Sequence, residues 1–246
     1  MNQTPYADAT PDRQLRGGHA LVTGAGSGIG RAVARALAGA GMRLWLVGRR
    51  ADALRAALPE SPDAQIVAAD LSTASGLATA IDACPASLDV LVHCAGTFLP
   101  GGPAGIETKE RERMDALNME APLALTRRCL PALRVASGQV VVVNSSAGLR
   151  PPGPGNTAYA AGKQRLRAAT DALRQEINPH GIRVLSVFPG RTDTPMQTTV
   201  LAAEGRTAPT DCLLQPEDVA AMILAALALP TRAEVTDIMI RPARAL

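Results

Sequence analysis

A tyrosine and a lysine stand four residues apart in the segment Tyr159-Ala-Ala-Gly-Lys163. The surrounding stretch, Thr157–Ile177, carries apolar residues at helical spacing. Residues four apart on a helix share a face, so a phenol and an ammonium point the same way. Alone this pattern is weak, because such pairs are frequent by chance on helix surfaces.

Two serines follow a strand that has no polar face. Gln139-Val-Val-Val-Val143 is apolar on both sides, which is typical of a strand inside a parallel sheet. Asn144-Ser145-Ser146 comes directly after it. This is the edge at which α/β proteins bind their ligands, so we expect the hydroxyl groups near a ligand.

Glycines fill a predicted turn between a strand and a helix. The segment Thr23–Gly30 has the pattern T-G-x3-G-x-G. Glycine lets the backbone turn tightly and approach a pyrophosphate, which then sits on the free N–H groups at the positive end of the following helix. The pattern indicates a nucleotide site, with an ordinary glycine-rich turn as the alternative.

The elements that must hold these residues alternate between strand and helix. We predict strands over 19–23, 43–47, 65–68, 88–93, 139–143, 182–188 and 235–240, and helices over 31–40, 51–58, 74–83, 109–133, 157–177 and 216–227. No composition break or internal repeat interrupts the alternation. We therefore expect an α/β fold in one domain: a doubly wound parallel sheet with helices on both faces. Residues 1–16 are predicted to be a flexible tail, and 17–246 to be the domain.

Composition narrows the class of protein. The 246 residues are 47% apolar and only 2% aromatic, so the core must be aliphatic. The net charge is +3 and no basic stripe suggests nucleic acid as a partner. No apolar run approaches the roughly 20 residues of a membrane helix, and no secretory signal is visible at the N-terminus. The four cysteines form no paired motif and His93 has no cluster around it. We expect a cytoplasmic protein with no membrane contact and no metal site.

Taken in order, the glycine turn, the strand-end serines and Tyr159-x3-Lys163 resemble the short-chain dehydrogenase/reductase family, in its single-domain branch. The resemblance runs from about residue 18 to the C-terminus. It implies a Rossmann-type fold and reversible hydride transfer between NADP(H) and a small-molecule carbonyl or secondary alcohol. Two alternatives stay open. One is a non-redox enzyme of the same family, such as a dehydratase or epimerase, and the other is a nucleotide-sensing regulator, which would not need the tyrosine.

The resemblance also implies catalytic roles. Tyr159 is the general acid/base, and Lys163, together with the oxidised nicotinamide, lowers the phenol pKa from its ordinary value of about 10. Lys163 also bonds the nicotinamide ribose. Asn118 holds a water molecule of the proton relay, and a serine polarises the substrate oxygen.

Either of the two serines can take that last role. The spacing to the tyrosine that is common in the family selects Ser146, whereas a glycine three residues after the serine selects Ser145, because Gly148 then matches. We favour Ser145, since a strand end is rigid whereas the loop after it, with three prolines and two glycines over 149–156, can absorb an extra residue. Neighbouring strand residues face opposite sides, so only one hydroxyl can point at the substrate.

Further cofactor contacts follow from the resemblance. Asp70-Leu71 matches the acidic position beside the adenine, with a plain turn aspartate as the alternative. Ala95-Gly96 passes close to the ribose, and Cys94 stands where the family has an amide. Backbone at Thr192 meets the carboxamide and Thr194 supports the phosphates. The complete expected set is Gly24, Ser27, Gly28, Ile29, Gly30, Arg49, Arg50, Asp70, Leu71, Ala95, Gly96, Tyr159, Lys163, Pro189, Gly190, Thr192 and Thr194.

The end of the second strand indicates which nicotinamide cofactor is used. NAD-preferring relatives carry an acid there that binds the ribose hydroxyls. Here Gly48 is followed by Arg49 and Arg50. Without a carboxylate there is no repulsion, and guanidinium groups suit a phosphate, so we expect NADP(H) to be preferred over NAD(H). Solvated charges are the alternative, and Ser27 stands where many NADP-dependent relatives carry a second basic residue.

The substrate pocket is expected to be apolar. Phe98, the loop Leu149–Pro154 and residues 195–214 should line it, with Arg150 a candidate to meet an acidic group or else a solvent-facing side chain. The segment Pro189–Leu214 is predicted to be irregular and to hold a substrate lid over 191–214.

Family members usually form homotetramers or homodimers. They pair through the helices that correspond to those around Leu123–Leu133 and Thr157–Ile177, and we expect the same assembly here.

Overall fold

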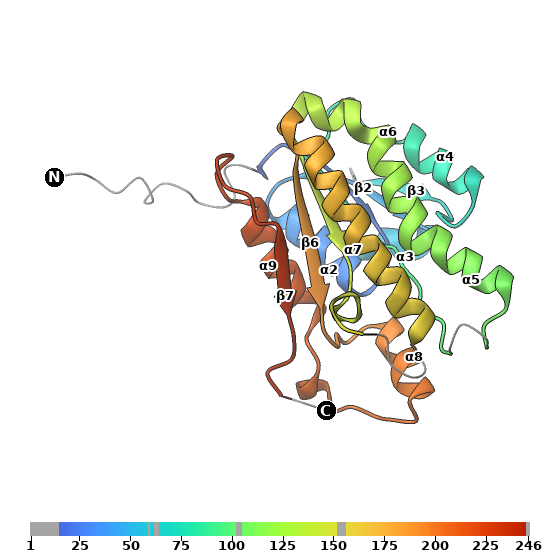
Figure 1. Cartoon of the computed structure of the whole chain (residues 1–246). Helices are drawn as coiled ribbons and strands as arrows, with labels where there is room; N and C mark the ends of the chain where they lie inside the picture. Colours follow the sequence, from blue (N-terminus) through green and yellow to red (C-terminus); the bar gives the residue numbers. More distant parts are fainter. Residues whose placement is uncertain (1–14, 59, 62–63, 102–104, 152–155, 245–246) are drawn as a thin grey trace.

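The computed structural model describes residues 15–58, 60–61, 64–101, 105–151 and 156–244. Within them, one seven-stranded sheet has the order β3-β2-β1-β4-β5-β6-β7, and all strand neighbours are parallel (Figure 1). The predicted parallel sheet is confirmed, with strand ends shifted by one or two residues. The strands are β1 His19–Thr23, β2 Arg43–Gly48, β3 Gln65–Ala68, β4 Val90–His93, β5 Gln139–Val143, β6 Arg183–Pro189 and β7 Asp237–Ile240.

Helices cover both faces of this sheet. Helices α2, α3 and α9 pack on one face, and α4, α6 and α7 on the other (Figure 1). The helices are α2 Gly28–Gly39, α3 Ala51–Ala57, α4 Ala74–Asp82, α5 Thr108–Asp115, α6 Ala121–Ala136, α7 Thr157–Ile177, α8 Pro195–Ala203 and α9 Pro216–Leu227. Short turns add the π-helix η1 Ala116–Glu120 and the 3-10 helices η2 Ser146–Leu149, η3 Asn178–His180 and η4 Thr210–Cys212.

The inner strands β1, β4, β5 and β6 are largely continuous apolar runs because both of their faces are buried. Val141 packs into the core under α2 and α9, whereas its neighbours Val140 and Val142 pack under α6 and α7. This division follows from the alternation of side chains along a strand. Both cores consist mainly of Leu, Val, Ile and Ala, as the low aromatic content requires, with Phe188 the largest fully buried side chain among the described residues.

The direction of winding changes at the centre of the sheet. Strand β1 lies between β2 and β4, so the chain leaves β1 toward one edge and returns on its other side. At this switch point the carboxyl ends of β1 and β4 lie together, and in such sheets ligands bind in the crevice beside those ends. In Figure 1, α8 lies past the arrowheads of β6 and β7, at the same edge.

Three predicted boundaries are wrong. The single helix expected over 109–133 is interrupted by the π-helical turn Ala116–Glu120. Pro122 has no N–H to donate to the carbonyl of Asn118, four residues earlier, and a proline of this kind favours such a break. The segment expected to be irregular contains α8, and Pro189 ends β6. Leu15, assigned to the tail, is buried in the core; the tail before it lies outside the described residues.

Candidate active site

Helix α7 carries Tyr159 and Lys163 on the face that meets the end of β5. The ammonium nitrogen of Lys163 lies 5.8 Å from the centroid of the Tyr159 ring and donates to the carbonyl of Val143 at 3.3 Å. Lys163 is 5% exposed, so the protein holds a buried cation beside the phenol. The predicted pairing of these two side chains on one helix face is therefore present in the structure.

Ser145 is the serine that faces this pair. Its hydroxyl is hydrogen-bonded to Tyr159 and also accepts from the backbone N–H of Ala147 at 3.1 Å. Its backbone is still extended, whereas Ser146 begins the 3-10 helix η2. Gly148 fits a close approach, because a Cβ there would lie only 3.0 Å from both Asn144 Oδ1 and the carbonyl oxygen of Lys163. The strand-end anchor thus directs Ser145 toward Tyr159.

Burial shifts the proton affinities of the site. Desolvation raises the pKa of Tyr159, and the hydrogen bond from Ser145 opposes that rise. Desolvation lowers the pKa of Lys163 to about 8, against a smaller opposing effect of Cys94. Tyr159 is consequently protonated at neutral pH, and a cation stands beside it to stabilise the phenolate once the proton leaves.

Asn118 lies in the π-helical turn and is buried. Its side-chain amide makes two hydrogen bonds with the backbone of Thr97. Oδ1 accepts from the N–H and Nδ2 donates to the carbonyl, both at 2.8 Å. Asn118 therefore fixes the chain just after Ala95-Gly96. π-helical turns inside α-helices are frequent at functional sites.

The glycine turn brings β1 and β4 into close contact. Gly24 has φ of +68°, and a Cβ on it would lie 2.8 Å from the backbone nitrogen of Ala95. Ser27, which precedes α2, makes no side-chain cap hydrogen bond, so the N–H groups of the first turn have no side-chain acceptor there. Such a turn fits a pyrophosphate on the helix N-terminus. Ile29 packs against the core beneath the turn.

Thr23, at the end of β1, holds the chain that follows β4. Its hydroxyl accepts from the backbone N–H groups of Cys94 and Ala95, each at 3.1 Å, and donates to the carbonyl of Val92 at 3.3 Å. These bonds tie the ends of β1 and β4 together beside Cys94. Thr23 opens the glycine motif, but the motif alone does not predict this bonding role.

The residues expected around the adenosine lie further along the same edge. Arg49 and Arg50 are exposed after β2, and neither guanidinium group bonds another described residue. Both carboxylate oxygens of Asp70 have partners: Oδ1 accepts from the N–H and hydroxyl of Ser72, and Oδ2 forms a 2.7 Å ion pair with Arg113. These bonds lower the pKa of Asp70. Leu71, beside it, is buried.

The segment after β6 runs back toward the glycine turn. Gly190 donates to the carbonyl of Ile240 at 2.7 Å, and Thr192 is buried, with its hydroxyl on the carbonyl of Gly190. Thr194 caps α8 by accepting from the N–H of Gln197 at 3.2 Å. A Cβ on Gly28 would lie 2.9 Å from Thr194 Cγ2, so the cap sits directly against the glycine turn.

The expected pocket residues divide into two groups. Phe98 packs edge-on against Tyr159, with ring centroids 5.4 Å apart. Leu149 and Arg150 instead border an open groove of about 390 Å³ along the flank of α7, where Arg167 also lies, and the Arg150 side chain is exposed. Residues 152–155 of the expected loop lie outside the described residues.

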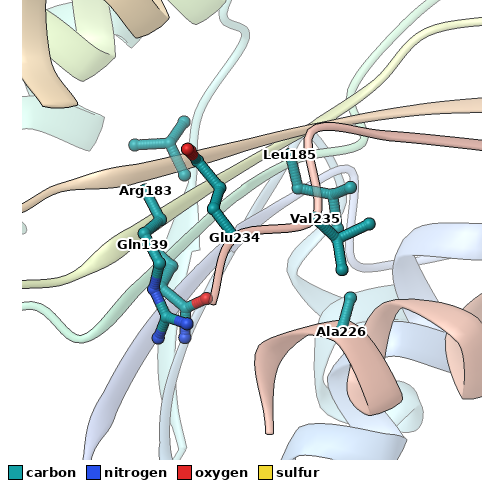
Figure 2. A pocket seen from close by; sticks show the side chains of 7 residues that line it. Gln139, Arg183, Leu185, Ala226, Glu234 and Val235 are labelled. Atoms are coloured by element: carbon teal, nitrogen blue, oxygen red, sulfur yellow. The ribbon is translucent and has the colours of Figure 1, made fainter. Parts of the chain in front are cut away.

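A second cavity lies at the opposite edge of the sheet, at the amino ends of β5 and β6 (Figure 2). It measures about 10 Å³, room for at most one water molecule. Arg183 donates to the carbonyl of Ala233 and Glu234 accepts from the N–H of Val184, so these charges secure the loop before β7. This cavity is a small void between packed side chains and is too small to hold a substrate or cofactor.

In the part of the chain that the structure describes, no helix is long and apolar enough to cross a membrane. The same residues hold no group of three or more His, Cys, Asp or Glu placed to bind a metal ion. His93 is buried, with Nε2 2.8 Å from the hydroxyl of Thr126 on α6.

Two curated relatives resemble most of this chain. A glycine betaine reductase of Emericella nidulans is 36% identical over 245 residues, covering 94% of this chain but only 19% of that protein. An uncharacterized oxidoreductase of Staphylococcus epidermidis is 30% identical over 228 residues, covering 91% of this chain and 96% of the relative. The second relative therefore corresponds to the present chain nearly end to end.

Solved structures of the same architecture bind nicotinamide cofactors. An alcohol dehydrogenase from Thermococcus sibiricus, complexed with 5-hydroxy-NADP, has a TM-score of 0.82 at 26% identity, covering 92% of this chain and 97% of its own. A 3-ketoacyl-(acyl-carrier-protein) reductase from Brucella melitensis, complexed with NADH, has a TM-score of 0.82 at 27% identity, covering 94% of this chain and 100% of its own.

The family pattern described as short chain dehydrogenase matches residues 18–205, which include the glycine turn, the strand-end serines and the Tyr-Lys pair. With this match, and with relatives named as oxidoreductases aligned over nearly the whole chain, the protein belongs to the short-chain dehydrogenase/reductase family.

Proposed function

We propose that the protein transfers a hydride between NADP(H) and a carbonyl or secondary alcohol. The observation that carries this proposal is the meeting of Ser145, Tyr159 and Lys163 at the carboxyl edge of the sheet, next to the glycine turn. A nucleotide-sensing regulator would need the turn but not a buried phenol–ammonium pair.

The side chains have complementary tasks in reduction. The nicotinamide supplies the hydride when bound. Ser145 donates a hydrogen bond to the substrate oxygen and so stabilises the negative charge that develops there. Tyr159 gives that oxygen its proton, and the raised pKa of the phenol keeps the proton available until then. Lys163, with a pKa of about 8, is charged at neutral pH and stabilises the resulting phenolate.

Asn118 and Thr23 act through the backbone. They hold the chain around Ala95-Gly96 in place, so the segment expected beside the cofactor ribose has a fixed position. We assign to Asn118 the additional task of holding a water molecule of the proton relay.

Turnover separates this function from its rivals. Purified protein should consume NADPH in the presence of some member of a panel of aldehydes and ketones. Tyr159→Phe should abolish that consumption and leave NADPH affinity nearly unchanged, because only the transferable proton is removed. A variant that keeps more than a few per cent of kcat would contradict the role of Tyr159. A wild type that binds NADPH but reduces nothing would favour the sensor.

We further propose that NADP(H) is preferred because Arg49 binds the phosphate on the adenosine ribose. A charge-assisted hydrogen bond contributes about 1.5–3 kcal/mol, or roughly 10–150-fold in affinity. Arg49→Ala should lose that factor for NADPH and nothing for NADH. Arg55 is an exposed arginine in α3, the helix that follows Arg49. Arg55→Ala is the matched control and should change the affinity for neither cofactor. Equal losses for both cofactors, or a wild type that prefers NADH, would defeat the assignment.

Assembly and location complete the proposal. We propose a homotetramer or homodimer that pairs through α6 and α7, in keeping with the family; light scattering on the purified protein checks its mass in solution. A cytoplasmic location stays a prediction, supported by four free cysteines.

A further inference from the structure

The first turn of α8 lies across the expected cofactor path. At its start, Thr194 touches the glycine turn at Gly28, as described above. Two residues on, the methyl carbon of Met196 lies 3.9 Å from where a Cβ on Gly96 would be. This turn therefore spans the gap between the glycine turn after β1 and the chain that follows β4.

Gln197, the next residue of this turn, is a buried amide without a partner. The residue is 9% exposed, and its side-chain nitrogen Nε2 is buried with no hydrogen bond to any residue that the structure describes. Its backbone N–H is satisfied by Thr194, so the side chain is not needed for the helix cap. Leaving a buried amide donor unpaired is unfavourable, and such groups in native proteins usually have a partner.

Among the described residues, three other buried side-chain atoms lack hydrogen-bond partners: two are acceptors, and the third belongs to a guanidinium group that is already paired. Asn144 Oδ1 and Asn178 Oδ1 are acceptors, so they cannot bind another acceptor oxygen. Arg191 Nη1 belongs to a guanidinium group that already holds Glu204 at 2.9 Å. Gln197 is the buried neutral donor in this set, and it belongs to the helical turn whose Thr194 touches Gly28 and whose Met196 lies near Gly96.

We propose that Gln197 is a cofactor-binding residue, whose Nε2 donates a hydrogen bond to an acceptor oxygen of the nicotinamide dinucleotide. The inference rests on the proposed function. The acceptor is a pyrophosphate oxygen or the nicotinamide carboxamide oxygen, since the turn spans both expected positions. Helix α8, at the start of the predicted lid, then binds the cofactor directly as well as covering it.

The direct test is the affinity of Gln197→Met for NADPH, measured by calorimetry. Methionine matches glutamine in length and helix propensity, so the variant loses the donor and keeps the helix. We expect the dissociation constant to rise about tenfold or more if the acceptor is a charged phosphate, and about 2–12-fold if it is a neutral carboxamide. Thr199→Ala, an exposed position on the same helix, is the matched control and should bind as the wild type does.

Two further arms identify the oxygen. 2′-Phospho-ADP-ribose carries the pyrophosphate but no nicotinamide, so the affinity of Gln197→Met for it falls only if the pyrophosphate is the partner. Gln197→Glu replaces the donor by an anion, and it should bind NADPH more weakly than Gln197→Met if the partner is charged.

The inference and the proposed function fail in different ways. If the wild type binds NADPH and Gln197→Met, folded by circular dichroism, binds it equally well, the inference is overturned and the proposed function stands. If Gln197→Met and Thr199→Ala weaken binding equally, the effect comes from the helix and the inference is again overturned. If the wild type binds neither NADPH nor NADH, the proposed function and the role of Gln197 are both contradicted.

Discussion

At the scale of single residues, two neighbouring serines compete for one task. Ser145 ends the extended run of β5 and is hydrogen-bonded to Tyr159, whereas Ser146 has entered the 3-10 turn. Adjacent residues of an extended chain point to opposite sides, so the two hydroxyls cannot both reach the substrate. The geometry supports Ser145 over the family spacing, which favours Ser146.

Replacing each serine separately tests this choice. Ser145→Ala should lower kcat/KM by about 10²–10³-fold, the usual loss when one donor to a developing oxyanion is removed. Ser146→Ala serves as the matched control and should stay close to the wild type in a steady-state assay. The reverse ranking would show that the spacing to the tyrosine is the better guide.

Several contacts of the site could not be predicted from the sequence, because they join residues far apart in the chain. Thr23 is hydrogen-bonded to the backbone of Cys94 and Ala95, which lie about seventy positions later in the sequence. Arg113 is hydrogen-bonded to Asp70, which lies 43 positions earlier. The chemistry of Tyr159 and Lys163 could be predicted, because one helix sets their spacing. Gln197 was missed because its burial depends on where the whole of α8 packs.

At the scale of elements, the segment after β6 is built as a loop with joined ends. Leu214 donates to the carbonyl of Arg191 at 2.9 Å, and Asp193 donates to the carbonyl of Leu214 at 2.8 Å. Between these joined ends lie α8 and η4. A segment anchored at one place can move as a unit over the site, which is what a lid requires.

Hydrogen exchange should identify this lid. Without ligand, the backbone amides over 195–213 should exchange faster than those of any other internal segment, because few of them are held by the sheet. NADPH should slow their exchange, since the first turn of α8 lies over the expected cofactor path. Uniformly strong protection in the free protein would refute the lid.

The elements that the sequence predicted well are those with a strong apolar pattern. The four inner strands β1, β4, β5 and β6 are buried on both faces, and α7 and α9 carry apolar stripes, so periodicity was enough. Helix α8 was missed because Thr198, Thr199 and Val200 are β-branched and favour extended structure. Thr194 followed by Pro195 is a good helix start, and that signal could have found it. The π-helical turn depends on backbone register, which no side-chain pattern displays.

At the scale of the whole molecule, a buried histidine makes stability depend on pH. His93 joins β4 to α6 through the hydroxyl of Thr126, which in turn donates to the carbonyl of Pro122 at 2.8 Å. Burial lowers the pKa of His93 to about 3. The unfolded chain binds a proton below about pH 6.5, whereas the folded protein does not until near pH 3, so acid favours unfolding across that interval.

Urea unfolding at two pH values checks this linkage. Between about pH 7 and pH 5 the free energy of unfolding of the wild type should fall by about 2 kcal/mol more than that of His93→Leu, which has no imidazole to protonate. This interval lies above the range in which ordinary carboxyl groups titrate. An equal fall in both proteins would show that His93 is not the source of the dependence.

The central claim, hydride transfer from a nicotinamide with proton transfer from Tyr159, is tested most directly by following the hydride itself. NADPH deuterated at the transferred position is incubated with a reducible carbonyl compound, and the alcohol is analysed by mass spectrometry. We predict one deuterium on the carbinol carbon with the wild type and no alcohol with Tyr159→Phe. Alcohol without deuterium, or alcohol formed equally by both proteins, would contradict the account.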